Sequence, residues 1–135
     1  MPAKSRSGGH PRPPAGPVPG KQLYAVDAVL TPASPVSDIG ELTALATAAV
    51  QAGGGHVLDT SHVIFPNGAV TLVLILAESH LAIHTWPEEN LIAIDLFSCG
   101  TIDGQLVAAE LTRLLRLDGV AMRRIERGPA GSDRD

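Results

Sequence analysis

The feature that most constrains the fold is a run of three strand-like segments separated by short turns. Residues 70–77 (VTLVLILA) are apolar and rich in branched side chains, and residues 81–86 and 91–97 continue the pattern. Residues 87–90 (PEEN) form the turn between the last two segments. Strands joined by short turns pair antiparallel, because parallel pairing needs a long crossover. The centre of the chain therefore predicts an antiparallel sheet with a buried central strand.

Two amphipathic segments predict the helices that cover this sheet. Asp38 and Glu41 have the spacing of a capping box, and apolar residues recur at three and four positions behind them until glycines 53–55. A second helix is expected over about residues 103–117. The remaining strands are expected over residues 23–30, 56–64 and 120–126. These elements favour an α+β fold, a two-layer sandwich in which an antiparallel β-sheet carries two main helices on one face.

Composition divides the chain into one domain and two tails. Residues 1–20 hold most of the 11 prolines and little that could be buried, so a disordered N-terminal tail is expected there. Residues 129–135 are expected to form a flexible C-terminal tail. One domain remains over residues 21–128, which is long enough to fold around a single core.

Charge, hydropathy and cysteine count exclude several classes of function. A net charge of −4 and 3% aromatic residues argue against nucleic-acid binding, which usually needs a basic face and stacking rings. No apolar run has the length of a membrane span, and residues 1–20 lack the apolar region and cleavage pattern of a secretory signal. One cysteine permits no internal disulfide, which suits a reducing compartment. We therefore expect a cytoplasmic protein without nucleic-acid or membrane partners.

Reactive side chains are concentrated in residues 78–88 (ESHLAIHTWPE), inside the strand pattern. This stretch holds a serine, two histidines and two glutamates, and the chain's only cysteine, Cys99, follows it. The Gly-x-Ser-x-Gly turn of a hydrolase nucleophile is absent. His56 and His62 could suggest a metal, but no spacing supports a closed site, so no metal is predicted. Serine, histidine and cysteine together suggest covalent chemistry at one site.

Residues 78–88, followed by residues 94–100 (IDLFSCG), resemble the self-processing core of bacterial S-adenosylmethionine decarboxylases. The resemblance is strongest over residues 77–100 and looser over residues 20–128. It implies that the chain cuts its own peptide bond between Glu78 and Ser79. Attack of Ser79 Oγ on the Glu78 carbonyl would convert the amide into an ester. Elimination and hydrolysis would then leave a covalent pyruvoyl group at the new N-terminus, with residues 1–78 and 79–135 as two subunits.

The resemblance implies a chemical role for each matching residue. Ser79 becomes the pyruvoyl cofactor, whose ketone forms a Schiff base with the substrate amine and accepts the electrons released as carbon dioxide leaves. His84 takes the role of the processing base, and Thr71 retains the hydroxyl of a processing serine. Cys99 takes the role of the general acid that protonates the substrate Cα.

Two further positions are implied to bind the substrate. Glu88 matches a carboxylate that hydrogen-bonds the ribose hydroxyls, and Phe65 lies near a ring that stacks on adenine and faces the sulfonium. Trp86 is expected to pack, and His80 has no assigned role. The implied substrate is S-adenosylmethionine, whose decarboxylated product donates the aminopropyl group for spermidine. The implied assembly is a homodimer of cleaved α/β protomers with sites near the interface.

Three positions depart from the family pattern and leave two other functions open. Gln22 replaces a histidine, the acid at Asp27 is displaced by one residue and so changes face, and Leu72 replaces a glycine. These changes affect substrate recognition more than pyruvoyl chemistry. One alternative is a pyruvoyl-dependent decarboxylase of a free basic amino acid, ornithine or arginine. The other is a non-processing homologue that acts as a binding or regulatory subunit, although the serine, histidine and cysteine of the motif are all present.

Overall fold

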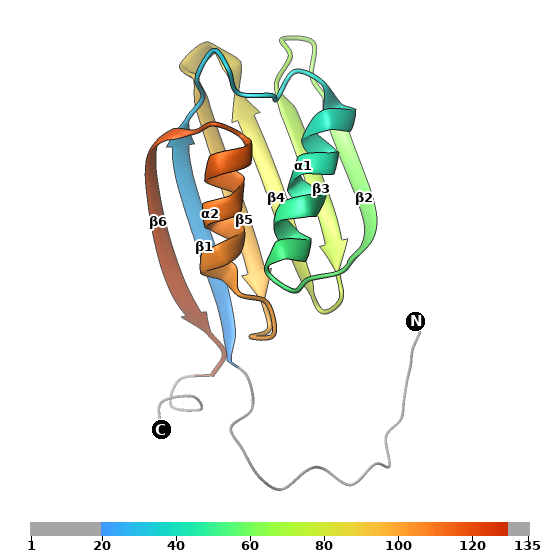
Figure 1. Cartoon of the computed structure of the whole chain (residues 1–135), viewed down its shortest axis with the longest axis vertical. Coiled ribbons are helices and arrows are strands. Elements are labelled where there is room, and N and C mark those ends of the chain that lie inside the picture. Colours follow the sequence, from blue (N-terminus) through green and yellow to red (C-terminus); the bar gives the residue numbers. More distant parts are fainter. Residues whose placement is uncertain (1–19, 130–135) are drawn as a thin grey trace, which may run out of the picture.

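The computed structural model describes residues 20–129, so nearly all of both predicted tails lies outside the described residues. Its elements are β1 (Lys21–Val29), α1 (Ile39–Ala52), β2 (Val57–Ile64), β3 (Val70–Leu76), β4 (Ser79–Trp86), the short 3₁₀ helix η1 (Pro87–Glu89), β5 (Leu91–Ser98), α2 (Gly104–Leu114) and β6 (Asp118–Arg127). The strands form one antiparallel sheet in the order β2-β3-β4-β5-β1-β6. Both helices lie side by side on one face of it (Figure 1). The predicted α+β two-layer sandwich is confirmed.

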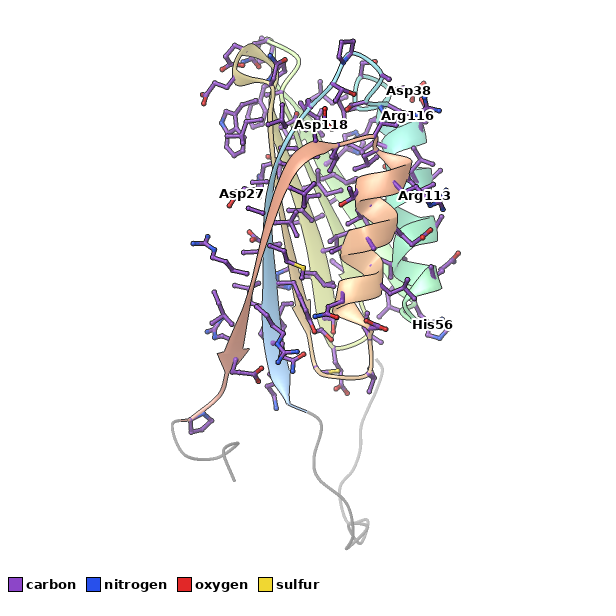
Figure 2. All side chains as sticks on the ribbon, turned by 60° about the vertical axis from the view of Figure 1, so that its left-hand side comes forward. Asp27, Asp38, His56, Arg113, Arg116 and Asp118 are labelled. Carbon is purple, nitrogen blue, oxygen red and sulfur yellow. The ribbon has the colours of Figure 1, made fainter. Side chains whose placement is uncertain are left out.

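Alternation along the strands builds the core between the sheet and the helices. Every second residue of β3 is buried, and Leu72 and Leu74 are fully enclosed. Alternate residues of β4 face the same core, and Leu81 and Ile83 among them are fully buried. Burial of each such side chain stabilises the fold by roughly 1.5–3 kcal/mol relative to exposure. The helix-free face stays open: Figure 2 shows Asp27 on that face and Arg113 on the helix side.

Side-chain caps fix where the two helices begin. The Asp38 carboxylate accepts hydrogen bonds from the Gly40 and Glu41 amides at 2.8 and 3.1 Å. Asp103 accepts one from the Leu106 amide at 3.1 Å at the start of α2. The first residue of α2 is Gly104, because a Cβ there would lie 2.1 Å from the Tyr24 ring. Glycine therefore lets this end of α2 pack directly on β1.

Among the boundaries that differ from the sequence-based prediction, two have a plain structural cause. The second helix ends at Leu114 rather than near residue 117, because Arg116 adopts a left-handed conformation with φ 53°. β4 begins at Ser79 rather than at Leu81, since Ser79 already pairs with Leu76 across a two-residue turn. Ser79 is therefore part of the sheet, at one of its ends. Within residues 20–129, neither α1 nor α2 combines the length and the apolar content that crossing a membrane requires.

Candidate active site

The tight turn between β3 and β4 contains the predicted cleavage point. It consists of Ala77 and Glu78, and Glu78 has φ 58°, a left-handed conformation that costs a non-glycine residue roughly 1–2 kcal/mol. The following Ser79 Oγ is buried and has no hydrogen-bond partner among the described residues. Buried hydroxyls are normally paired, and exceptions gather at functional sites. A strained residue therefore directly precedes an unpaired hydroxyl.

Cys99 lies at the same end of the sheet as Ser79, because β4 begins with Ser79 and antiparallel β5 ends at Ser98. The start of β4 and the end of β5 are at the bottom of the sheet in Figure 1. Phe97 pairs with His80 in the β4–β5 ladder, and the two rings stack with centroids 5.9 Å apart. Cys99 follows the last residue of β5 and is partly buried. Its Sγ lies 3.7 Å from Thr101 Oγ1. The ladder thus brings the strand end that carries Ser79 beside the strand end that precedes Cys99.

The opposite end of the same strands forms a pocket. Its volume is about 350 Å³, and its lining includes Phe65, Asn67, Thr71, His84 and Trp86. Two aromatic rings and several hydrogen-bonding side chains face one space, which is the usual composition of a small-molecule site. The pocket thus gathers Phe65, Thr71 and His84, three residues predicted separately from the sequence.

A histidine–hydroxyl pair lies inside this pocket. Thr71 and His84 are directly opposite each other in the β3–β4 ladder, and Thr71 Oγ1 lies 3.2 Å from His84 Nδ1. His84 also contacts the Trp86 ring two residues along the strand, with centroids 6.1 Å apart. A hydrogen bond at one ring nitrogen fixes the tautomer and leaves the other nitrogen available. The pair is arranged to move a proton.

The substrate-binding carboxylate predicted at position 88 lies at the rim of the same pocket. Glu88 belongs to the exposed helix η1, and its Oε1 accepts a hydrogen bond from Asn67 Nδ2 at 3.4 Å. Asn67 is itself held by its own turn, where its Oδ1 accepts from the Ala69 amide at 3.0 Å. Glu88 and the pocket-lining residues therefore form one cluster, at the end of the sheet where η1 joins β4 to β5.

The two ends are too far apart to work together within one chain. His84 is five residues along β4 from Ser79, and a rise of about 3.3 Å per residue separates their Cα atoms by about 17 Å. Alternation along β4 also places them on opposite faces of the sheet. Ser79 points to the same face as buried Leu81, whereas His84 points to the open face, like His80. The structure therefore does not bring the predicted processing base to the predicted cleavage point.

The three departures from the family pattern have distinct surroundings. Gln22 lies at the Ser79 end, where its Oε1 accepts a hydrogen bond from the Tyr24 hydroxyl at 3.0 Å. Asp27 lies on the open face, with its Oδ2 3.9 Å from a guanidinium nitrogen of Arg123. Leu72 directly follows Thr71 of the pocket, but it is fully buried on the opposite face, under the helices. Only the first departure lies at the end of the sheet that carries the cleavage point.

Sequence reasoning missed two residues of the pocket. Trp86, for which only packing was expected, is 37% exposed and forms part of the wall. Asn67 was assigned no role from the sequence, yet it joins the pocket to Glu88. Its position two residues after Phe65 was the available signal. Residues 20–129 contain no group of three or more side chains arranged to hold a metal ion.

Comparisons with known proteins identify the family of the chain. The family model described as S-adenosylmethionine decarboxylase matches residues 22–128. S-adenosylmethionine decarboxylase proenzyme 2 of Bacillus anthracis is 40% identical over 81 residues, which are 59% of this chain and 66% of the relative. The S-adenosylmethionine decarboxylase proenzyme of Thermotoga petrophila is 42% identical over 82 residues, 60% of this chain and 62% of the relative.

The matched segments span somewhat under two thirds of these curated relatives. Among solved structures, the adenosylmethionine decarboxylase of Aquifex aeolicus VF5 has the same fold, with a TM-score of 0.70 at 19% identity, covering 88% of this chain and 99% of that one. The family match covers the whole described fold and both clusters of predicted residues. The chain belongs to the S-adenosylmethionine decarboxylase family.

Proposed function

We propose that this chain is a self-processing, pyruvoyl-dependent S-adenosylmethionine decarboxylase that makes the aminopropyl donor for spermidine biosynthesis. The observation that carries the proposal is the unpaired, buried Ser79 hydroxyl directly after the left-handed Glu78. A hydroxyl without a partner needs to break no hydrogen bond before it attacks. A strained peptide loses strain when it is cut.

Processing follows from the chemistry of these residues. Ser79 Oγ attacks the Glu78 carbonyl carbon, the C–N bond breaks, and the serine nitrogen takes a proton, which leaves an ester. A base then removes the Ser79 Cα proton, and the Glu78 carboxylate leaves from Cβ. Water hydrolyses the resulting dehydroalanine, releases ammonia and leaves the pyruvoyl group. His84, oriented by Thr71, is the proposed base.

The separation of the two clusters supports a homodimer of cleaved protomers. A second copy packed on the open sheet face, with its strands reversed, would bring the pocket of one protomer to the Ser79 end of the other. Exposed apolar side chains on that face, among them Ile75, Trp86 and Ile125, favour such packing. An isologous two-fold contact would create two equivalent composite sites.

The pocket suits an adenosyl sulfonium better than a free amino acid. The Phe65 and Trp86 rings offer stacking surfaces for a base and a cation–π contact for a sulfonium. The Glu88 carboxylate can accept hydrogen bonds from ribose hydroxyls. Ornithine or arginine has no ring to stack and no ribose, so this pocket would be largely unused by the alternative substrates.

Cys99 is the proposed proton donor to the substrate Cα. When formed, the pyruvoyl group supplies an electron sink for the loss of carbon dioxide. Ser79 fits that group, because its hydroxyl is buried, unpaired and at a strand end beside the Cys99 loop. The thiol must stay reduced to act as an acid, which favours the cytoplasm as the place of action.

Denaturing mass spectrometry and a carbon dioxide release assay test the proposal together. The purified chain should separate into two pieces cut between Glu78 and Ser79, and Ser79→Ala should remain whole. Carbon dioxide should be released from S-adenosylmethionine and not from ornithine or arginine. A wild-type chain that stays uncut would reject both decarboxylase functions in favour of a non-processing homologue.

A further inference from the structure

The loop that contains Cys99 is held by a side chain to which the proposed chemistry gives no role. Ser98, the last residue of β5, is fully buried. Its Oγ accepts a hydrogen bond from the Gly100 amide at 3.1 Å and donates one to the Ile102 carbonyl at 3.4 Å. Both bonds close the loop over Cys99, so one hydroxyl ties down the chain after the thiol.

The backbone of this loop turns sharply after Cys99. Gly100 has φ 99°, which side-chain-bearing residues rarely adopt. The turn carries Thr101 back toward the thiol, where its Oγ1 lies 3.7 Å from Cys99 Sγ. The direction of the thiol therefore depends on the conformation that Ser98 holds.

Ser98 is also the link between this loop and the cleavage point. The β4–β5 ladder ends at the pair His80–Phe97, so Ser79 and Ser98 each lie one residue beyond that last pair, at the same end of the sheet. On its other side Ser98 pairs with Gln22 of β1. Its backbone is thus held by β1, while its hydroxyl reaches forward into the Cys99 loop.

We propose that Ser98 is a positioning residue that sets the Cys99 thiol relative to residue 79, with Thr101 orienting the thiol. The inference rests on the proposed function, in which Cys99 is the proton donor. Proton transfer requires donor and acceptor atoms about 2.6–3.2 Å apart. A displacement of about 1 Å at a reacting group can lower the rate by about 100-fold. A neutral buried hydroxyl fixes the loop without adding a second acid.

Three variants separate positioning from ordinary core packing. Ser98→Ala removes both hydrogen bonds, Ser98→Thr keeps the hydroxyl, and Thr43→Ala removes a part-buried hydroxyl of α1 that bonds the Ile39 carbonyl. Each is measured as the full chain for cleavage, kcat and KM with S-adenosylmethionine, and the rate of Cys99 alkylation by iodoacetamide. Because Cys99 is the only cysteine, alkylation reports on this thiol alone.

Ser98→Ala should be cleaved and should keep KM within about twofold, while kcat falls by about tenfold or more because the donor is misplaced. Its alkylation should be severalfold faster at the same pH, since the loop opens to the reagent. Ser98→Thr and Thr43→Ala should behave like the wild type. Unchanged kcat and alkylation in cleaved Ser98→Ala would overturn the proposal.

A separate readout on the wild-type chain covers the case in which Ser98→Ala does not fold. Hydrogen exchange should show the Gly100 amide protected, since its partner is buried, and rapid exchange there would equally reject the proposal. If the wild type releases no carbon dioxide, the proposed function fails. The alkylation and exchange measurements then still decide whether Ser98 fixes the loop.

Discussion

The two ends of the sheet differ in what they hold in place. At one end, a two-residue turn and a short loop fix Ser79 and Cys99, the residues that would make and break bonds. At the other end, Phe65, Thr71 and His84 line an open pocket suited to binding and proton transfer. About 17 Å of β4 separates Ser79 from His84 at a rise of about 3.3 Å per residue. We therefore propose that one protomer carries two half-sites rather than one site.

The largest effect should come from mixing two defective chains, which tests whether the two ends of the sheet complement each other between protomers. Ser79→Ala lacks the nucleophile and His84→Ala lacks the base, so each alone should remain uncut. In a mixed dimer, one composite site combines the intact Ser79 of one chain with the intact His84 of the other. Co-expression should therefore restore cleavage of the His84→Ala chain only, from none to a clear fraction by mass spectrometry.

The mixing experiment is informative because it shows which of the two chains is cut. Distinguishable affinity tags identify which chain is cut, and separate expression of each variant is the control. If His84→Ala is cut on its own, His84 is not the processing base. If the mixture stays uncut although mixed dimers form, the two ends do not complement each other between protomers.

The next largest effect should come from Cys99→Ala, which tests the end that carries Ser79. Cleavage should continue, because the acyl shift does not use the thiol. The kcat for S-adenosylmethionine should fall by about 100-fold or more, the usual contribution of a general acid. Carbon dioxide release by the cleaved protein measures this, and a kcat close to that of the wild type would remove Cys99 from the mechanism.

Thr71→Val tests whether the pocket end takes part in processing. Valine keeps the shape but removes the hydroxyl that lies 3.2 Å from His84 Nδ1. Cleavage should slow by about tenfold or more, because the ring loses the partner that orients it. Thr71→Ser keeps the hydroxyl and should cleave normally in the same time course. Equal rates for the valine and serine variants would contradict a processing role.

Glu88→Gln tests the pocket end as a binding site, with Glu89→Gln in the same turn as the matched control. The lost charge-assisted hydrogen bond, worth about 1.5–3 kcal/mol, should raise KM by about tenfold or more. The kcat should change little, since Glu88 acts only on substrate binding. Steady-state kinetics measure KM and kcat for both variants. An equal rise of KM in Glu88→Gln and Glu89→Gln would show a general charge effect instead.

The smallest effect should come from Glu78→Gly, which relaxes the left-handed residue before the cleavage point. If about 1 kcal/mol of strain assists cleavage, its loss should slow processing by about fivefold. The free energy of unfolding of the Ser79→Ala chain should change by less than about 1 kcal/mol, because relief of strain and the entropy of glycine oppose each other. Cleavage after cell-free synthesis gives the rate, and an unchanged rate would exclude strain as a contributor.

Local patterns in the sequence predicted most of the fold. The run from Val70 to Phe97 predicted three adjacent strands, and the cap at Asp38 and the glycine at 53 marked the ends of the first helix. The boundary at Ser79 was missed, because serine and histidine interrupt an apolar pattern without ending the strand. Pairing with β3 and β5 overrides local preference there.

Sequence alone determined which residue types are present: a serine after Glu78, a single cysteine, and a histidine five positions beyond the serine. It could not reveal that these residues divide between two ends of a sheet, or that Asn67 and Trp86 join the pocket. Strand direction and ladder register decide both, because they bring together residues that are distant in the chain. Only the tertiary structure decided that Ser79 Oγ is buried without a partner and that Ser98 closes the Cys99 loop. Burial and hydrogen bonding depend on all the strands that surround an atom, and no local stretch of sequence contains them.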